Sequence, residues 1–250
     1  MKIKDKKAEL TTQQIVILIV LITSFVVILF FLFRLNLQEE TQKEICHNSV
    51  VLKGKSISGF GKLDCRTNYL CVSGGGECEG INPTQTIKVN SNDKEEIMKA
   101  IADEMSDCWK IFGEGKIDYT SADFTGKIEC AICSIVSFDE NFEETTIPHQ
   151  EFYDYLITAK KTNSQTYLQY LYLTNTLEIF EDFTPENYLS NEIDTKKEHF
   201  ILTGMAKQGY VNLILSPALS LEHNPYPVVI LEKTEDNLKA VGCDNFITKA

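Results

Sequence analysis

One uninterrupted apolar segment, from Ile15 to Phe33, constrains this chain more than any other feature. Its nineteen residues carry no charge, and Thr23 and Ser24 are its only polar members. Because a helix rises about 1.5 Å per residue, the segment would cover roughly 28 Å, close to the ~30 Å hydrocarbon core of a bilayer. The run is longer than the apolar region of a secretory signal peptide, and no small-x-small cleavage site follows it. The sequence therefore predicts a retained transmembrane helix over residues 15–34, with the lipid bilayer as its partner.

Basic residues are distributed unequally around this segment. Four lysines lie within residues 1–14, whereas the following flank holds Arg34 and then several glutamates. Loops rich in lysine and arginine stay in the cytoplasm. We therefore expect a single-pass protein of the cell membrane, with residues 1–14 as a cytoplasmic tail and the C-terminal domain outside the cell.

A more specific interpretation applies to the residues just before the apolar run. Lys6-Lys7-Ala8-Glu9 is similar to the cleavage site of archaeal prepilin-type signals, in which a basic pair and a small residue precede the cut. Processing near Ala8 would make the protein a pilin-like filament subunit, whose helix packs in a filament core. The alternative is an ordinary signal-anchor that keeps its basic tail.

The remainder of the chain is strongly acidic. The whole chain has a net charge of −12, and residues 35–250 hold 19 basic and 34 acidic side chains, a net of −15. Such a surface repels phosphate backbones and anionic lipid headgroups. We therefore expect no nucleic-acid partner, and the simplest role of the charge is solubility.

All eight cysteines follow the apolar segment. An even number of cysteines on an oxidising side of the membrane favours disulfide bonds, although eight cysteines allow 105 complete pairings. Because closing short loops costs less entropy, we expect one local group formed by the first four and another formed by the last four. The disulfide candidates are Cys46, Cys65, Cys71, Cys78, Cys108, Cys130, Cys133 and Cys243.

The pattern of apolar residues predicts an α+β fold, with mainly antiparallel strands and a few packed helices. We expect a juxtamembrane stalk over residues 35–45, a small Cys-rich β region over 46–90 and an α+β ectodomain over 91–250. The predicted helices cover Asp93–Phe112, a segment opened by Pro148, about Ser164–Leu173 and a segment starting near Thr184. The predicted strands are Val50–Leu52, Tyr69–Val72, Thr86–Val89, Lys127–Phe138, a hairpin over His199–Leu213, Tyr226–Glu232 and Phe246–Thr248.

Cys130-Ala131-Ile132-Cys133 is the one motif that matches an active site. In thiol–disulfide oxidoreductases such a pair lies at a helix start, where the helix dipole lowers the pKa of the first thiol. Here β-branched residues surround the motif, which favours a strand interior and structural cysteines. Zinc is a further alternative, but Cys65 and Cys71 are spaced too widely to form the second close pair of a structural site.

Other candidate sites have simpler explanations. The four histidines, His47, His149, His199 and His223, have no metal-site spacing, so we expect no metal and no cofactor. Ser73-Gly74-Gly75-Gly76 could wrap an anion but lacks the rest of a P-loop, and the acidic run 139–144 is best explained as a solvated loop. Six tyrosines between residues 153 and 188 form either a binding face or the edge of the core.

In three segments the chain resembles uncharacterised single-pass membrane-anchored proteins of small-genome archaea. These segments are Thr11–Gln14, Cys108–Trp109 and Cys130–Cys133, and the resemblance runs from the anchor to about Phe138 and again near Gly242–Cys243. It implies membrane anchoring and an archaeal cell envelope, and no activity. The leading hypothesis is a non-enzymatic, extracytoplasmic structural or interaction protein; the alternatives are a pilin-like subunit and an envelope oxidoreductase using Cys130 and Cys133.

Overall fold

The structure is a computed structural model. It describes residues 12–34, 37–55, 61–90, 93–120, 128–142, 145–173, 192–206 and 225–248. The chain divides into two compact units, Met1–Thr41 and Gln42–Ala250, which are treated separately below. The predicted processing site at Ala8, the helix expected near Thr184 and the second half of the 199–213 hairpin lie outside the described residues.

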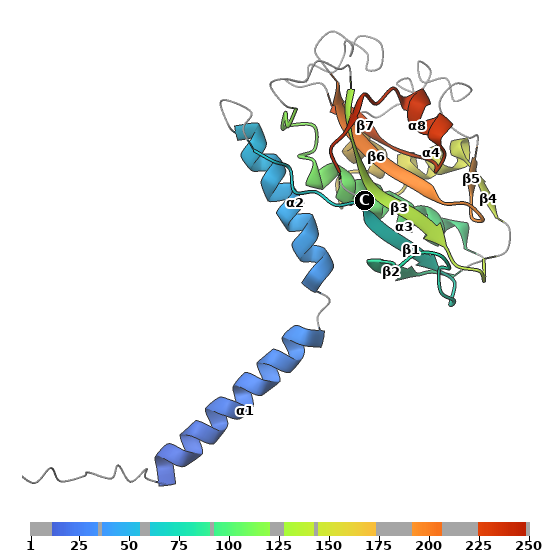
Figure 1. The fold of residues 1–250 in the computed structure, drawn as a ribbon. Coiled ribbons are helices and arrows are strands. Elements are labelled where there is room, and N and C mark those ends of the chain that lie inside the picture. The colour runs from blue at the N-terminus through green and yellow to red at the C-terminus, as the bar shows by residue number, and fades with distance from the viewer. Residues whose placement is uncertain are drawn as a thin grey trace, which may run out of the picture. The chain divides into compact units, whose positions relative to one another are not determined.

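The predicted apolar helix is present as α1, Thr12–Arg34 (Figure 1). Its segment Gln13–Phe30 is long and apolar enough to cross a membrane, and none of it is buried within the protein. The two hydroxyl groups within the apolar segment are bonded inside the helix. Thr23 donates to the Ile19 carbonyl at 2.9 Å, and Ser24 donates to the Leu21 carbonyl at 2.9 Å. The helix can therefore enter an apolar medium without leaving a described hydroxyl unbonded.

A single mixed sheet forms the centre of the second unit. Its strands run in the order β2-β1-β3-β6-β7, and β8 pairs with β3. Pairs β1–β2, β1–β3 and β3–β8 are parallel, whereas β3–β6 and β6–β7 are antiparallel. The expectation of mainly antiparallel strands is therefore wrong for this sheet, in which three of the five strand pairs are parallel. The strands are β1 (Asn68–Ser73), β2 (Gln85–Lys88), β3 (Ile128–Phe138), β6 (His199–Ala206), β7 (Pro225–Glu232) and β8 (Asn245–Phe246).

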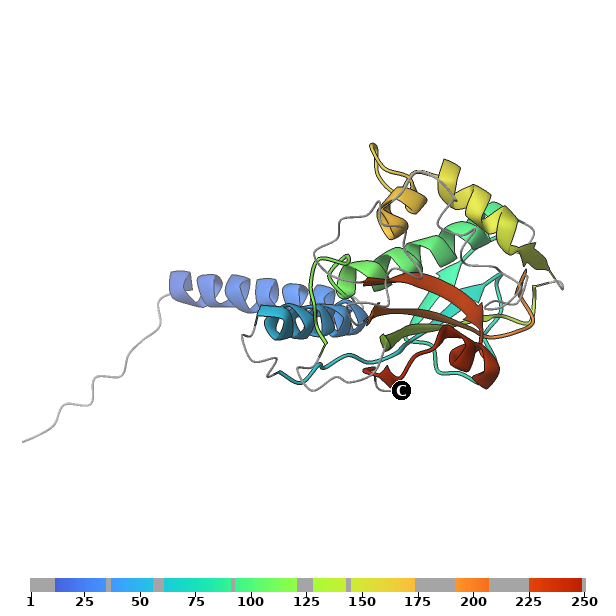
Figure 2. The same ribbon diagram turned by 90° about the horizontal axis from the view of Figure 1, so that it is seen from above.

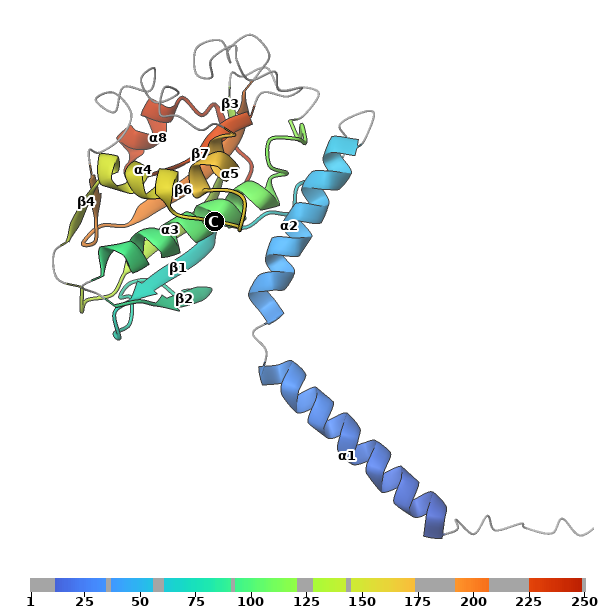
Figure 3. The same ribbon diagram turned by 180° about the vertical axis from the view of Figure 1, so that it is seen from behind.

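Helices cover both faces of this sheet, as Figures 2 and 3 show. Helices α3 (Lys94–Ile111), α4 (His149–Thr158) and α5 (Tyr167–Tyr172) lie on one face, and α8 (Glu235–Val241) lies on the other. Strands β3, β6 and β7 are buried along almost their whole length, which explains their nearly continuous apolar sequences. A separate two-stranded sheet pairs β4 (Thr146–Pro148) with β5 (Glu192–Asp194).

The helix predicted over Asp93–Phe112 is confirmed in detail. The Asp93 carboxylate caps the first turn by accepting hydrogen bonds from the backbone N–H groups of Glu95 and Glu96. The predicted apolar stripe is buried, with Ile97 and Ile101 at 0 % exposure. Helix α3 therefore packs its stripe on the sheet and fixes the larger of the two cores.

Helix α2, Leu37–Lys55, corrects two predictions. Val50–Leu52, predicted as a strand, is helical; Val50 is fully buried, while Leu52 is 69 % exposed. A short apolar run does not distinguish a helix turn from a strand, which explains the error. Residues 46–90 also do not form a separate β region, because β1 and β2 belong to the central sheet and the folded unit begins at Gln42.

A buried carboxylate connects α2 with the sheet. Glu104 of α3 is 4 % exposed and accepts hydrogen bonds from Ser134 of β3 and from Asn68 of β1, the latter at 3.1 Å. Lys43 of α2 reaches Glu104 at 3.4 Å and Asp107 at 3.0 Å. The charge of Glu104 is thus bonded from three elements, so that α2 is positioned by polar contacts as well as by packing.

Candidate functional site

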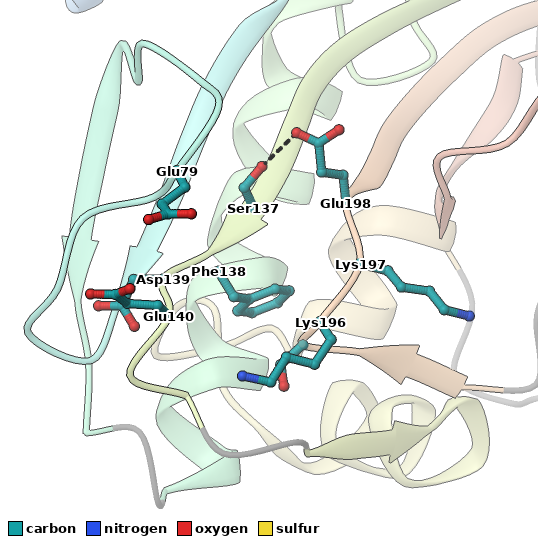
Figure 4. Close-up of a pocket in the computed structure, with 9 residues that line it drawn as sticks. Glu79, Ser137, Phe138, Asp139, Glu140, Lys196, Lys197 and Glu198 are labelled. Atoms are coloured by element: carbon teal, nitrogen blue, oxygen red, sulfur yellow. Dashed lines mark hydrogen bonds between the residues drawn. The ribbon is translucent and has the colours of Figure 1, made fainter.

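A hollow of about 350 Å³ lies where strands β3 and β6 separate (Figure 4). Pairing of β3 with β1 continues to Phe138, but its pairing with β6 ends at Val136 and His199. The hollow also lies at the carboxyl ends of the parallel strands β1 and β3, the edge at which open α/β sheets place ligands. Its lining residues are Glu79, Ser137, Phe138, Asp139, Glu140, Thr195, Lys196, Lys197 and Glu198.

Asp139 links the ends of the two parallel strands. It follows β3 directly, is 2 % exposed, and its Oδ2 accepts hydrogen bonds from the Gly76 N–H at 2.6 Å and the Ser73 hydroxyl at 3.0 Å. Its Oδ1 accepts from the Asn141 N–H at 3.1 Å. The glycine-rich loop after β1 therefore binds a carboxylate of its own chain. The Gly76 N–H, which could otherwise bind an external anion, is occupied by Asp139.

The wall formed by the start of β6 has its charges paired. Glu198 accepts a hydrogen bond from the Ser137 hydroxyl at 3.1 Å and forms an ion pair with Lys233 at 2.5 Å. Lys197 forms an ion pair with Glu232 at 2.9 Å and contacts Asp194 at 3.8 Å. Figure 4 shows the Lys197 side chain turned away from the centre of the hollow. These groups shape the wall, and their charges are already matched.

Three other charged groups face the hollow with weaker internal partners. The exposed carboxylates of Glu79 and Glu140 have no hydrogen bond or ion pair among the residues that the structure describes. The ammonium group of Lys196 donates to the Phe142 carbonyl at 2.5 Å and has no carboxylate partner in the same described ranges. The hollow therefore presents both signs of charge to solvent.

An aromatic cluster lies beneath these charges. The Phe138 ring, central in Figure 4, lies edge-on to Phe142 at 5.6 Å and to His199 at 6.2 Å between centroids. Burial lowers the pKa of His199 to about 4, and a Coulombic contribution from His149 acts in the same direction. Burial also lowers the pKa of His149 to about 4. Both rings are therefore neutral at pH 7, and His199, which contacts Phe138, forms part of the buried layer beneath the hollow.

The cysteines form four disulfide bonds, which respect the two predicted groups. The first four pair as Cys46–Cys65 and Cys71–Cys78, and the last four as Cys108–Cys133 and Cys130–Cys243. All eight cysteines are used, and none is free. Each bridge is expected to contribute about 2–5 kcal/mol, mainly by restricting the unfolded chain, and most for the longest loop.

The redox interpretation of Cys130 and Cys133 receives no support from this arrangement. The two cysteines lie in strand β3, as the sequence context indicated, and belong to different disulfides. Cys133 is part of the core under α3, whereas Cys130 is part of the core under α8. A dithiol active site needs the two sulfurs to bond to each other, and here they face opposite sides of the sheet.

The tyrosine-rich region is built into the edge of the core where the structure describes it. The hydroxyl of Tyr167 donates to Asp103 at 2.8 Å, and that of Tyr172 donates to the Val228 carbonyl at 2.8 Å. Burial, and then the bond to Asp103, raise the pKa of Tyr167, so its hydroxyl remains a donor. Tyr188, which belongs to the same region, lies outside the described residues.

The hollow itself was not predicted from the sequence. The sequence predicts a solvated loop at Asp139 and Glu140; Glu140 is exposed, but Asp139 is buried and hydrogen-bonded. A usable signal was present, since a glycine run follows one buried strand and an aspartate follows another. His149 and His199 are buried apart from any metal site, and no group of three His, Cys, Asp or Glu side chains in the described ranges is arranged to hold a metal ion.

Comparison with known proteins adds no relative. No protein-family model, no curated protein and no solved structure matches this chain. The resemblance to archaeal membrane-anchored proteins therefore rests on its three sequence segments alone, and any function must be argued from the chain itself.

Proposed function

We propose that this protein is a membrane-anchored, extracytoplasmic structural or interaction protein of the cell envelope, without enzymatic activity. One combination of features carries the proposal. An unburied apolar helix of membrane-spanning length precedes a folded unit in which all eight cysteines are paired. Disulfides persist in oxidising compartments, and the basic tail favours a cytoplasmic N-terminus. In this proposal the acidic domain lies outside the cell, where it would meet other envelope proteins.

The first experiment counts thiols in the native protein extracted from membranes. The protein is alkylated with and without a reductant, and modified cysteines are counted by mass spectrometry. We expect no free thiol without reductant and eight after reduction with unfolding. Eight accessible thiols in the native protein would contradict an oxidising location and would remove the main argument for the proposed topology.

A second experiment tests the anchor and its orientation. Leu18 and Val26 lie within α1, and a charged residue at the centre of a membrane helix costs about 2.5–3.5 kcal/mol. We expect Leu18→Arg with Val26→Arg to move the protein into the soluble fraction, whereas Leu18→Ala with Val26→Ala should stay in the membrane. Protease added to intact cells should digest the domain of the wild-type protein. If the domain were protected from the protease, the orientation would be the opposite of the one proposed.

The pilin-like alternative has a different consequence at the amino terminus. One observation favours it: the apolar helix α1 is followed by a second helix, α2, whose later turns belong to the folded unit through Val50 and the Cys46–Cys65 bond. A filament subunit needs a helix that packs against its own domain, and the later turns of α2 do so. Cleavage after Ala8, detected by intact mass of the mature protein, would support this alternative, and an intact N-terminus would eliminate it.

A further inference from the structure

The hollow between β3 and β6 holds opposite charges that do not pair with each other. Figure 4 shows Glu79 and Glu140 on one side of Phe138, and the Lys196 ammonium reaching toward that side from below. No ion pair joins Lys196 to either carboxylate among the described residues, and Lys196 bonds a carbonyl instead. An ammonium group has three donors, so two remain after the bond to Phe142. Because these charges are held apart, each can form an ion pair with the oppositely charged end of a ligand that carries both signs.

We propose that the hollow binds a small basic amino acid. The ligand's carboxylate would bond to Lys196, its ammonium groups to Glu79 and Glu140, and its methylene groups would lie against Phe138. This assignment adds a ligand to the proposed function and does not depend on the orientation of the anchor.

The net charge of the lining selects a basic ligand over a neutral one. Glu198 and Lys197 are neutralised by their ion pairs with Lys233 and Glu232. The rest of the lining contains three carboxylates, from Glu79, Asp139 and Glu140, and the ammonium group of Lys196, an excess of two negative charges. A ligand with two ammonium groups and one carboxylate brings a net positive charge and complements both signs. A simple anion would meet the same carboxylates and be repelled.

The volume limits the size of the ligand. A hollow of about 350 Å³ lies near the lower end of the range of roughly 300–1,000 Å³ found for small-molecule sites. Its lining is more polar than that of most such sites, so the affinity should be modest and should fall as ionic strength rises. These properties fit a molecule the size of a free amino acid.

The test uses the full chain in detergent and three probes of similar chain length that differ in their charged groups. L-lysine carries both charges, cadaverine is lysine without its carboxylate, and hexanoate carries a carboxylate alone. Isothermal titration calorimetry at low salt should detect lysine binding, cadaverine binding weaker by about tenfold, and no hexanoate binding, because the loss of one charge-assisted hydrogen bond lowers affinity by about tenfold or more. Equal affinity for lysine and cadaverine would reduce the site to simple charge attraction and overturn the proposal.

Substitutions assign each end of the ligand. Lys196→Gln should abolish the preference for lysine over cadaverine, whereas Lys196→Arg, which keeps the charge, should retain it. Glu79→Gln with Glu140→Gln should weaken lysine binding at least about tenfold. Matched controls on α8 are Lys239→Gln and Glu235→Gln, which are exposed and outside the hollow and should change nothing.

Two outcomes would refute the assignment independently of the topology. If titration of the folded wild-type protein with lysine gave no binding heat, the proposed site would be refuted, even if the thiol count supported the proposed function. If lysine bound equally well to Lys196→Gln and to Glu79→Gln with Glu140→Gln, the ligand would bind outside the hollow. Fluorescence of the buried Trp109, the single tryptophan, would show that each variant is folded before its titration is interpreted.

Discussion

Strand β3 is held by different interactions at its two ends. Its amino-terminal part is joined to β6 on one edge and to β8 on the other, and both of its cysteines are bridged. Its carboxyl end keeps only β1 as a strand neighbour and continues into Asp139 and the hollow. Two disulfides therefore bind the first part of β3 covalently to α3 and to the C-terminal segment. The carboxyl end has no disulfide of its own and is held by hydrogen bonds and packing, next to the loop that Cys71–Cys78 closes. This difference indicates which end can respond to pH, salt and a ligand.

The largest expected effect concerns the disulfide between β3 and the C-terminal segment. Cys130–Cys243 spans 113 residues and Cys108–Cys133 spans 25, so loop-closure entropy gives about 5 kcal/mol for the first and about 3.5 kcal/mol for the second. We expect Cys130→Ala with Cys243→Ala to lower the free energy of unfolding by about the larger amount. Urea titration followed by Trp109 fluorescence measures both double variants.

Hydrogen exchange adds a local readout to this comparison. Strand β8 pairs with β3 at two positions only, and the flanking amides of Asp244 and Ile247 donate to the Ile128 and Cys130 carbonyls. These two amides should exchange much faster once the Cys130–Cys243 bond is removed. The Cys108→Ala, Cys133→Ala variant should leave these amides protected. Equal exchange in the two variants would mean that β8 is held by packing and not by the disulfide.

Acid should act at the carboxyl end of β3. His149 and His199 have folded pKa values of about 4, and an unfolded histidine has a pKa of about 6.5. Above pH 6.5 the histidines are neutral in both the folded and the unfolded protein, so they do not change its stability. Between about pH 6.5 and 4 the unfolded chain binds protons that the folded chain excludes, so each histidine should reduce stability by up to roughly 3 kcal/mol. Below about pH 4 the loss should level off.

Substitution separates this acid effect from the titration of carboxylates. Glu232 and Asp194 lie near enough to favour protonated His199, while His149 opposes it, so the wild-type profile alone mixes several groups. We expect His199→Gln to flatten the fall in stability between about pH 6.5 and 4, with His149→Gln flattening it further. A slope that is identical in the wild type and the double variant would exclude these histidines as the cause. Urea midpoints across the range provide the measurement.

Loss of the Asp139 charge should have an intermediate effect at the same end. Asp139→Asn keeps the size of the side chain but weakens the bonds from Gly76 and Ser73, which should cost about 2 kcal/mol. Glu140→Gln, at the exposed neighbouring position, should be nearly neutral. A loss in the control as large as in Asp139→Asn would show that general charge, and not the bonded carboxylate, stabilises the loop.

Sequence patterns predicted the elements better than their arrangement. Helix α3 was identifiable because apolar spacing, the Asp93 cap and Gly113 all agree, and β3 because its apolar run is continuous. The parallel pairing of β1 with β3 was not, because Asn68 and Ser134 are far apart in the chain and no local turn signals the pairing. The sequence does not show whether Asp139 is hydrogen-bonded within the protein or solvated. The hollow could therefore be identified only from the structure.

The smallest expected effect concerns the ion pair at the wall of the hollow. Lys233 and Glu198 are separated by 2.5 Å, but each side chain is 36 % exposed, and such pairs contribute between about 0 and 1 kcal/mol. We expect Lys233→Ala to lower stability by less than about 1 kcal/mol and the difference to shrink in high salt, because Glu198 keeps its bond from Ser137. Urea titrations at low and high salt measure both effects. A salt-independent loss above about 2 kcal/mol would mean that this wall is as firmly fixed as the disulfide-bonded end, and the hollow would then be a rigid feature that a ligand must fit without adjustment.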